Sequence, residues 1–226
     1  MTPDPVQVPL WIDLSAVVVA AMGGAMVAVR SRFDLSGIVG LGILAGLGGG
    51  LIRDILLNEL PVAMRYPWYI VAAVAASVLV ALLSEQLDRR VSLMIIIDAG
   101  ALGLYGVTGT NKALANGLGV WPALLLGLVA GTGGGVIRDV MTAKPPFIFV
   151  RGGELYATAC LAGLLAYVSG WHLGVDETAC AVLAASLTFT VRLLAWRFQW
   201  HLPGAVDAPT KLKERFGTSG SGDSSD

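Results

Sequence analysis

Two stretches of this chain, AGLGGGLIRD at 45–54 and AGTGGGVIRD at 130–139, are near copies that lie 85 residues apart. The same offset relates further positions without a gap, among them Asp13 and Asp98, Gly24 and Gly109, Ala28 and Ala113, Gly42 and Gly127, Gly46 and Gly131, and Pro61 and Pro146. A self-similar sequence indicates that one structural unit occurs twice. The fold must therefore accommodate two copies of the same arrangement.

The repeat is set in an apolar chain. Hydrophobic residues make up 55% of the 226 residues and charged residues only 14%, whereas a soluble domain carries about a quarter charged residues. A helix needs about 20 mostly apolar residues to span a bilayer. Seven segments come close: 8–29, 36–57, 68–83, 91–108, 121–141, 155–169 and 179–195. We therefore expect an all-α, polytopic membrane protein with seven transmembrane helices.

The number of spans in each copy predicts how the two copies are oriented. Each copy holds three spans, an odd number, so the second copy must enter the membrane from the opposite face. The expected organisation is an inverted 3+3 repeat plus one helix: a first repeat at 8–84, a second at 91–170, a seventh helix at 175–200 and a polar, disordered tail at 203–226. This architecture is typical of transporters, in which the pathway lies between the repeats.

Lysine and arginine in the connections predict the orientation, because cytoplasmic loops retain positive charge. One predicted side holds Arg30, Arg32, Arg89, Arg90, Lys144, Arg151, Arg192, Arg197, Lys211, Lys213 and Arg215. The other side holds only Arg65 and Lys112. The bias predicts an N-terminus outside the cell and a C-terminus in the cytoplasm.

The glycine triplets at 48–50 and 133–135 fall near the middle of the second and fifth spans. Spacing by four, as in Gly42, Gly46 and Gly50, is typical of close helix packing. That stripe leaves out Gly48, Gly49, Gly133 and Gly134, and each glycine costs a helix up to about 1 kcal/mol relative to alanine. We therefore expect the second and fifth helices to be broken at the triplets and to line a pathway. Packing alone is the alternative.

Charged residues inside spans are costly, so they are expected to face the bundle interior or a water-filled cavity and to have partners. Asp13 and Arg53 fall at matching depths near one membrane surface, and Asp98 and Arg138 fall at matching depths near the other. We therefore expect each repeat to pair its own aspartate with its own arginine, either to hold the fold together or to border a pathway.

Three further charged residues belong to the same regions. Asp54 and Asp139 follow their arginines by one residue, which is about 100° around a helix, so they are expected to face different neighbours. Lys112 ends the fourth span, where it either extends to the membrane interface or guards an outer mouth.

Other classes of function find no support in the residues. A formal net charge of -1 suggests no nucleic-acid surface. The glycine stretches lack the third glycine of a dinucleotide-binding fingerprint and the lysine of a P-loop. Cys160 and Cys180 lack metal-ligand spacing, and His172 and His201 lie beyond predicted span ends. We expect no enzymatic activity, no metal site and no cofactor.

Three groups of residues carry a resemblance to a known family: GLGGGLIRD with GTGGGVIRD, DAGALGLYGVTGTNKA from Asp98, and GELYATA from Gly153. Over about 13–196 the chain resembles the prokaryotic trimeric intracellular cation channel family, whose two-copy domain is also called the bacterial glycine transporter domain. The resemblance implies a homotrimer in the plasma membrane of a prokaryote. Each protomer would have its own pore, bordered by the broken second and fifth helices, for monovalent cations such as potassium.

The resemblance and the charge argument together define the candidate residues of the ion pathway. They are Asp13, Gly48, Gly49, Gly50, Arg53, Asp54, Asp98, Lys112, Thr132, Gly133, Gly134, Gly135, Arg138 and Asp139. The expected partners are monovalent cations, membrane lipid and two further copies of the chain, and no nucleic acid.

Three functions compete: a cation channel, a carrier for a small solute such as glycine, and a membrane scaffold. Half-helix amino ends would favour a carboxylate, while half-helix carboxyl ends and the aspartates would favour a cation. Both kinds of end would meet at the centre, so the residues alone leave channel and carrier open. The resemblance favours the channel.

Overall fold

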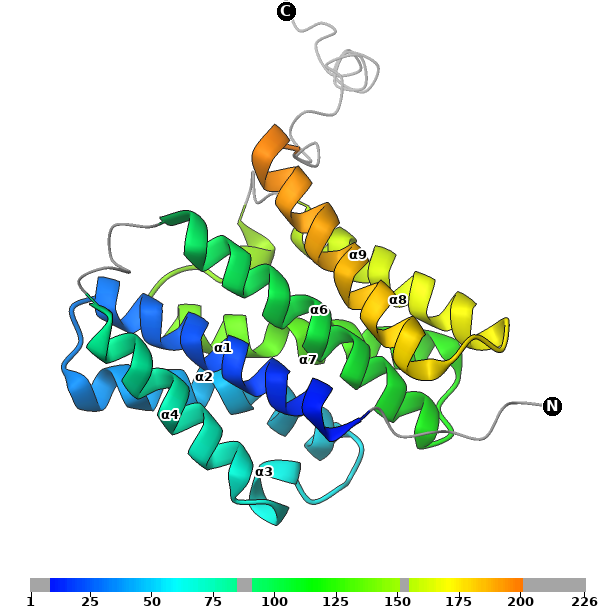
Figure 1. The fold of residues 1–226 in the computed structure, drawn as a ribbon, viewed down its shortest axis with the longest axis horizontal. Helices are drawn as coiled ribbons and strands as arrows, with labels where there is room; N and C mark the ends of the chain where they lie inside the picture. The colour runs from blue at the N-terminus through cyan, green and yellow to red at the C-terminus, as the bar shows by residue number, and fades with distance from the viewer. Residues whose placement is uncertain (1–8, 85–90, 151–154, 201–226) are drawn as a thin grey trace, which may run out of the picture.

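The protein is described by a computed structural model that covers residues 9–84, 91–150 and 155–200 (Figure 1). Within these residues it is all-α, without strands. The longer helices are α1 (Leu10–Arg30), α2 (Leu35–Leu56), α4 (Trp68–Leu82), α6 (Val91–Ala115), α7 (Val120–Met141), α8 (Tyr156–His172) and α9 (Glu177–Phe198). A single turn, α3 (Val62–Arg65), follows α2, and a 3-10 turn, η1 (Phe147–Phe149), follows α7.

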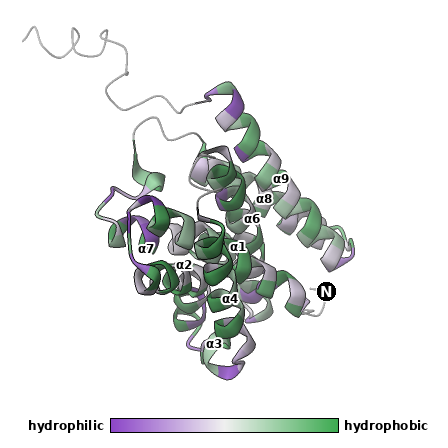
Figure 2. Ribbon diagram, turned by 60° about the vertical axis from the view of Figure 1, so that its left-hand side comes forward, coloured by the Kyte–Doolittle hydropathy of each residue, from purple (hydrophilic) through white to green (hydrophobic). Residues whose placement is uncertain are grey.

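The outer surface of the bundle is suited to lipid. Five of the described helices, α1, α2, α6, α7 and α9, are long and apolar enough to cross a membrane, and α4 is a shorter apolar helix. Apolar residues cover most of the helices in Figure 2. Many large apolar side chains are exposed, among them Leu82 at 76% and Trp121 at 79%. A surface that faces water rarely exposes so many of them. The expected polytopic membrane fold is confirmed.

The predicted spans correspond to the seven longer helices, with one clear difference. The fourth span was expected to end at Thr108, but α6 continues to Ala115. Its last two turns keep Thr110 and Asn111 buried against neighbouring helices, so their polarity does not end the helix. The repeat boundaries at 8–84 and 91–170 and the seventh-helix segment at 175–200 remain predictions, and the tail at 203–226 lies outside the described residues.

Helix packing repeats with the 85-residue offset. Gly46 of α2 lies against Val17 and Ala21 of α1, and the residues one offset later do the same, Gly131 of α7 lying against Leu102 and Gly106 of α6. Helices α1 and α6 run in opposite directions side by side (Figure 1). The two three-helix units are therefore inverted copies. Helix α9 packs on α6 and α8, outside the symmetric pair.

The glycine triplets do not break their helices, contrary to expectation: α2 and α7 are continuous from end to end. The four glycines off the packing stripe mark the place where α2 crosses α7. A Cβ on Gly49 would collide with the carbonyl oxygen of Ala130, and one on Gly134 with that of Ala45. Neighbouring Gly48 and Gly133 lie against isoleucine side chains of the opposite helix. Close backbone approach between the repeats therefore offsets the low helix propensity of glycine.

Candidate functional site

The first expected ion pair is present at one end of the bundle. Arg53 Nη1 lies 2.7 Å from Asp13 Oδ1, and the other oxygen of Asp13 accepts a hydrogen bond of 3.0 Å from the Tyr69 hydroxyl. Helices α1, α2 and α4 each supply one of these side chains. We call this group, together with Asp54, the Asp13 half of the site.

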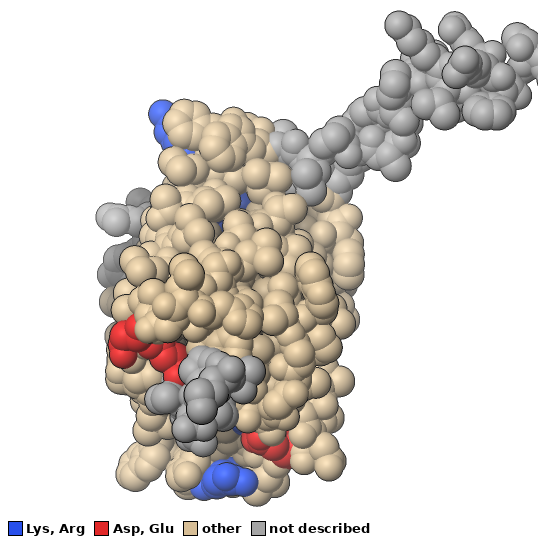
Figure 3. Space-filling view, turned by 90° about the vertical axis from the view of Figure 1, so that its right-hand side faces the viewer, with Lys and Arg blue, Asp and Glu red and all other residues tan. Residues whose placement is uncertain are grey.

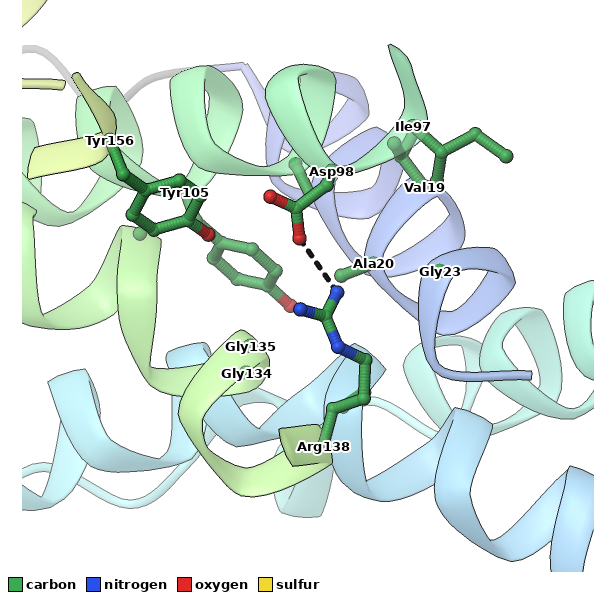
Figure 4. A pocket seen from close by; sticks show the side chains of 13 residues that line it. Val19, Ala20, Gly23, Ile97, Asp98, Tyr105, Gly134, Gly135, Arg138 and Tyr156 are labelled. Atoms are coloured by element: carbon green, nitrogen blue, oxygen red, sulfur yellow. Dashed lines mark hydrogen bonds and ion pairs between the residues drawn. The ribbon is translucent and has the colours of Figure 1, made fainter. Parts of the chain in front are cut away.

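The second expected ion pair repeats this arrangement at the opposite end. Arg138 Nη1 lies 2.7 Å from Asp98 Oδ1, and Tyr156 borders the same cavity as these two residues. Figure 4 shows this ion pair with the rings of Tyr105 and Tyr156 next to it. We call this group, together with Asp139, the Asp98 half. Both pairings follow the sequence-based prediction.

Asp54 and Asp139 were expected to face different neighbours from their arginines. Each has partners of its own but also contacts the arginine that precedes it. Arg53 Nε lies 2.8 Å from Asp54 Oδ1, and Arg138 Nε lies 2.9 Å from Asp139 Oδ1. The long arginine side chain folds back past its own helix turn, so the 100° separation at the backbone does not keep the groups apart.

The second oxygen of each of these aspartates holds the segment that follows the helix. Asp54 Oδ2 accepts the amide of Val62 at 2.8 Å, and Asp139 Oδ2 accepts the amide of Phe147 at 3.0 Å. Each carboxylate therefore ties its arginine to the first turn after a proline. Each aspartate therefore holds both its arginine and the segment that follows the helix.

Lys112 joins the two repeats at the Asp13 end. Its ammonium lies 2.8 Å from both Asp54 Oδ1 and Glu59 Oε2, while its side chain stays 21% exposed. The hydrogen bond from Lys112 is the main cause that holds the pKa of Glu59 below its ordinary 4.5, and a second bond from Asn116 acts in the same direction. Lys112 thus lies at the mouth of this half, tied down by two carboxylates.

Three cavities lie one after another along these groups. A cavity of about 650 Å³ at the Asp13 end is bordered by Asp13, Arg53, Tyr69 and Lys112. A small one of about 10 Å³ borders Asp13, Arg53, Tyr69 and Tyr105. A third, of about 20 Å³, borders Tyr105, Asp98, Arg138 and Tyr156. Acidic and basic side chains form only small patches on the end of the molecule seen in Figure 3. The charged groups of the site lie mainly inside.

The remaining candidates have varied positions. Gly50 and Gly135 face the rings or hydroxyls of Tyr105 and Tyr156 respectively, and Gly134 and Gly135 border the third cavity. Gly48, Gly49 and Gly133 belong to the helix crossing. Thr132 donates its hydroxyl to the carbonyl of Leu128 one turn earlier and borders none of the three cavities. A role in a pathway remains a prediction for each of them.

Sequence reasoning missed several groups of the site. The most prominent are Tyr69, Tyr105 and Tyr156. The Tyr69 hydroxyl contacts Asp13, the Tyr105 hydroxyl contacts the Gly46 carbonyl, and Tyr156 borders the third cavity beside Asp98. The available signal was a tyrosine within an apolar span, because a buried tyrosine hydroxyl needs a hydrogen-bond partner. Thr108 was also missed; its Oγ1 lies 3.4 Å from Arg53 Nη1.

Two more buried polar groups lie on α9 or contact it. The guanidinium of Arg192 stacks over the rings of Phe147 and Tyr156, 5.0 and 5.2 Å from their centroids, beside the Asp98 half. At the other end, Asn111 donates hydrogen bonds to Tyr167 and Glu177. Their partners come from elements far apart in the sequence, so spacing alone could not find them.

Known proteins share this organisation. A family model described as "Glycine transporter" matches twice, at 10–85 and 95–172. A UPF0126 membrane protein of Deinococcus radiodurans is 35% identical over 84% of this chain and 88% of its own length. The UPF0126 inner membrane protein YadS of Escherichia coli K12 is 33% identical over 85% of this chain and 92% of its own.

Solved structures agree with the sequence matches. The TRIC trimeric intracellular cation channel orthologue from Rhodobacter sphaeroides is 30% identical, with a TM-score of 0.77 over 84% of this chain and 97% of that one. A second TRIC cation channel, also 30% identical with a TM-score of 0.77, covers 86% of this chain and 95% of its own. The chain belongs to the trimeric intracellular cation channel family, whose repeated domain also bears the description glycine transporter.

Proposed function

We propose that this protein is a channel for monovalent cations such as potassium, with a pathway through each protomer of a homotrimer in the plasma membrane of a prokaryote. The pathway follows the three cavities between the two repeats, from the Asp13 half to the Asp98 half. The family relationship to TRIC cation channels supports both the ion and the trimer.

We infer the preference for a cation from the relative exposure of the two side chains in each ion pair. The Asp13 side chain is 15% exposed against 3% for Arg53, and Asp98 is 14% exposed against 6% for Arg138. In each pair the carboxylate is the more accessible partner, and the guanidinium is covered by protein. A permeating ion therefore meets negative charge first, and a low-dielectric surrounding strengthens that attraction.

The proposal predicts a change in ion selectivity when a pathway carboxylate is neutralised. Asp98→Asn leaves Arg138 with less negative charge beside it, so potassium conductance should fall and the reversal potential in a KCl gradient should move toward that of chloride. Planar-bilayer recordings of the purified protein measure both. Asp34→Asn is the matched control, because Asp34 is an exposed helix N-cap and asparagine caps equally well. An unchanged reversal potential in Asp98→Asn would contradict the proposal.

A carrier for a small zwitterion such as glycine is the second candidate. The cavity of about 650 Å³ is bordered by acidic Asp13 and Glu59 and by basic Arg53 and Lys112, which could hold both ends of an amino acid. The description of the family model points the same way. Uptake of labelled glycine into proteoliposomes, without potassium current, would favour the carrier.

A further inference from the structure

The two repeats place very different side chains at corresponding positions of α6 and α1. Tyr105, Thr108 and Lys112 are three and four residues apart, so they share one face of α6. Subtracting the repeat offset gives Ala20, Gly23 and Val27 on α1. The first set is large and polar, and the second is small and apolar.

Each set lies in its own half of the site. Tyr105 borders the small cavity of the Asp13 half, Thr108 Oγ1 contacts Arg53, and Lys112 pairs with Asp54. In the Asp98 half, Ala20 and Gly23 border the third cavity beside Asp98 and Arg138. The inverted symmetry of the backbone is therefore not matched by the side chains. Helix α6 contributes large side chains next to Arg53, while α1 contributes only small groups next to Arg138, where the cavity is about 20 Å³.

Tyr105 lies where the two halves meet. It borders the second and third cavities, so its side chain stands between the two ion pairs. It is only 2% exposed. Its hydroxyl donates to the carbonyl oxygen of Gly46 in α2, which fixes the ring across the contact between the repeats. Cβ atoms built on Gly49 and Gly50 would lie 3.6 Å from the ring, so the ring packs directly on the first glycine triplet.

We propose that Tyr105 is the barrier in the middle of the pathway, between the Asp13 half and the Asp98 half. The cavities on its two sides, about 10 and 20 Å³, have room for about one water molecule each. A permeating ion with its hydration shell must displace the ring. The corresponding residue of α1 is Ala20, so the repeat does not supply a second ring at this position. The inference depends on the proposed function only for the identity of the solute.

Potassium flux through proteoliposomes tests the barrier directly. Tyr105→Ala removes the ring and should raise flux severalfold. Tyr105→Phe keeps the ring and loses only the bond to Gly46, so its flux should lie between wild type and Tyr105→Ala. Ala20→Leu should lower flux, because the larger side chain fills the small cavity that Ala20 borders. Flux in a folded Tyr105→Ala variant equal to or below wild type would overturn the proposal.

Thiol labelling tests the same barrier without reference to any solute. Ala20→Cys is introduced with Cys160 and Cys180 replaced by alanine, and a small membrane-impermeant methanethiosulfonate is applied to oriented membrane vesicles from either side. With Tyr105 present, the reagent should not reach this cysteine from the Asp13 side. With Tyr105→Ala it should reach it from that side.

The two measurements separate the barrier from the proposed function. Labelling of Ala20→Cys from the Asp13 side with Tyr105 intact would overturn the barrier even if potassium passes. Tyr105-dependent labelling without potassium current would support the barrier and reject the cation channel.

Discussion

Arg53 and Arg138, two buried arginines related by the repeat, are held by different sets of side chains. Arg138 bonds Asp98 and Asp139. Arg53 bonds the corresponding aspartates and also lies near Thr108, and its Asp54 is shared with Lys112. Negative charge near Arg53 is therefore balanced by a second cation from the other repeat. Beside the Asp98 half the second cation is Arg192 of α9, which stacks on the Tyr156 ring.

The direct contact between Asp98 and Arg138 predicts strong coupling between them in the free energy of unfolding. Removing one partner of a buried pair leaves the other uncompensated, at a cost of about 3–5 kcal/mol. In a double-mutant cycle of Asp98→Asn with Arg138→Gln, the second substitution should therefore cost much less than the first. Denaturant unfolding in detergent micelles measures it. The cycle of Asp98→Asn with Arg53→Gln is the control and should be additive, since these residues belong to different halves. Additivity in both cycles would show that Asp98 and Arg138 are not energetically paired.

Among the helices, the crossing of α2 and α7 decides what the glycine triplets do. Sequence spacing identified one stripe, and the structure shows that its first two glycines face α1 in the first repeat and α6 in the second. The third glycine of each stripe instead faces a tyrosine, Tyr105 or Tyr156. Adjacent Gly48 and Gly49, with Gly133 and Gly134, provide a second contact face at about 100° to the first. A run of three glycines thus lets one helix approach two neighbours closely.

The crossing predicts that alanine is poorly tolerated at Gly49 and Gly134. The added methyl would meet a backbone carbonyl that cannot rotate away, and overpacking of this kind costs about 1–3 kcal/mol. Both variants should unfold at lower temperature in detergent. Gly40→Ala is the matched control in α2: a Cβ there meets nothing within 4 Å, so the variant should be unchanged or slightly more stable. Equal melting temperatures for all three variants would argue against a close crossing.

Sequence reasoning went as far as single elements and pairs within one repeat. Continuous apolar stretches located the helices. Equal depths of the charged residues in neighbouring spans located the Asp13–Arg53 and Asp98–Arg138 pairs. It failed where a contact joins two repeats. The α2–α7 crossing and the Lys112–Asp54 pair both depend on how the inverted copies dock, and the offset of 85 residues carries no information about that. Tyr105 was missed for the same reason, because its partner is a backbone carbonyl of the other repeat.

Across the whole molecule, an exact inverted repeat would give two equivalent mouths, and this protein departs from that symmetry in one direction. The Asp13 end has the large cavity, Lys112 and Glu59, followed by Tyr105. The Asp98 end has Ala20 and Gly23 at the positions of Tyr105 and Thr108, and Arg192 of α9 stacked beside it. Solute entering from the two sides therefore meets different groups. The physiological meaning of this difference depends on which end faces the cytoplasm.

The basic residues predict that the Asp13 end faces outward, because eleven of the thirteen connection and tail lysines and arginines lie on the other side. Cysteine labelling in intact cells measures this orientation, again with Cys160 and Cys180 replaced by alanine. Leu173 is 81% exposed in the connection between α8 and α9, so Leu173→Cys reports the Asp13 end. Phe149 is 77% exposed in η1, so Phe149→Cys reports the Asp98 end. An impermeant thiol reagent should label Leu173→Cys in intact cells, and Phe149→Cys only after the membrane is opened. The reverse result would place Tyr105 on the cytoplasmic side of the Asp98 pair and would make Lys112 a cytoplasmic residue.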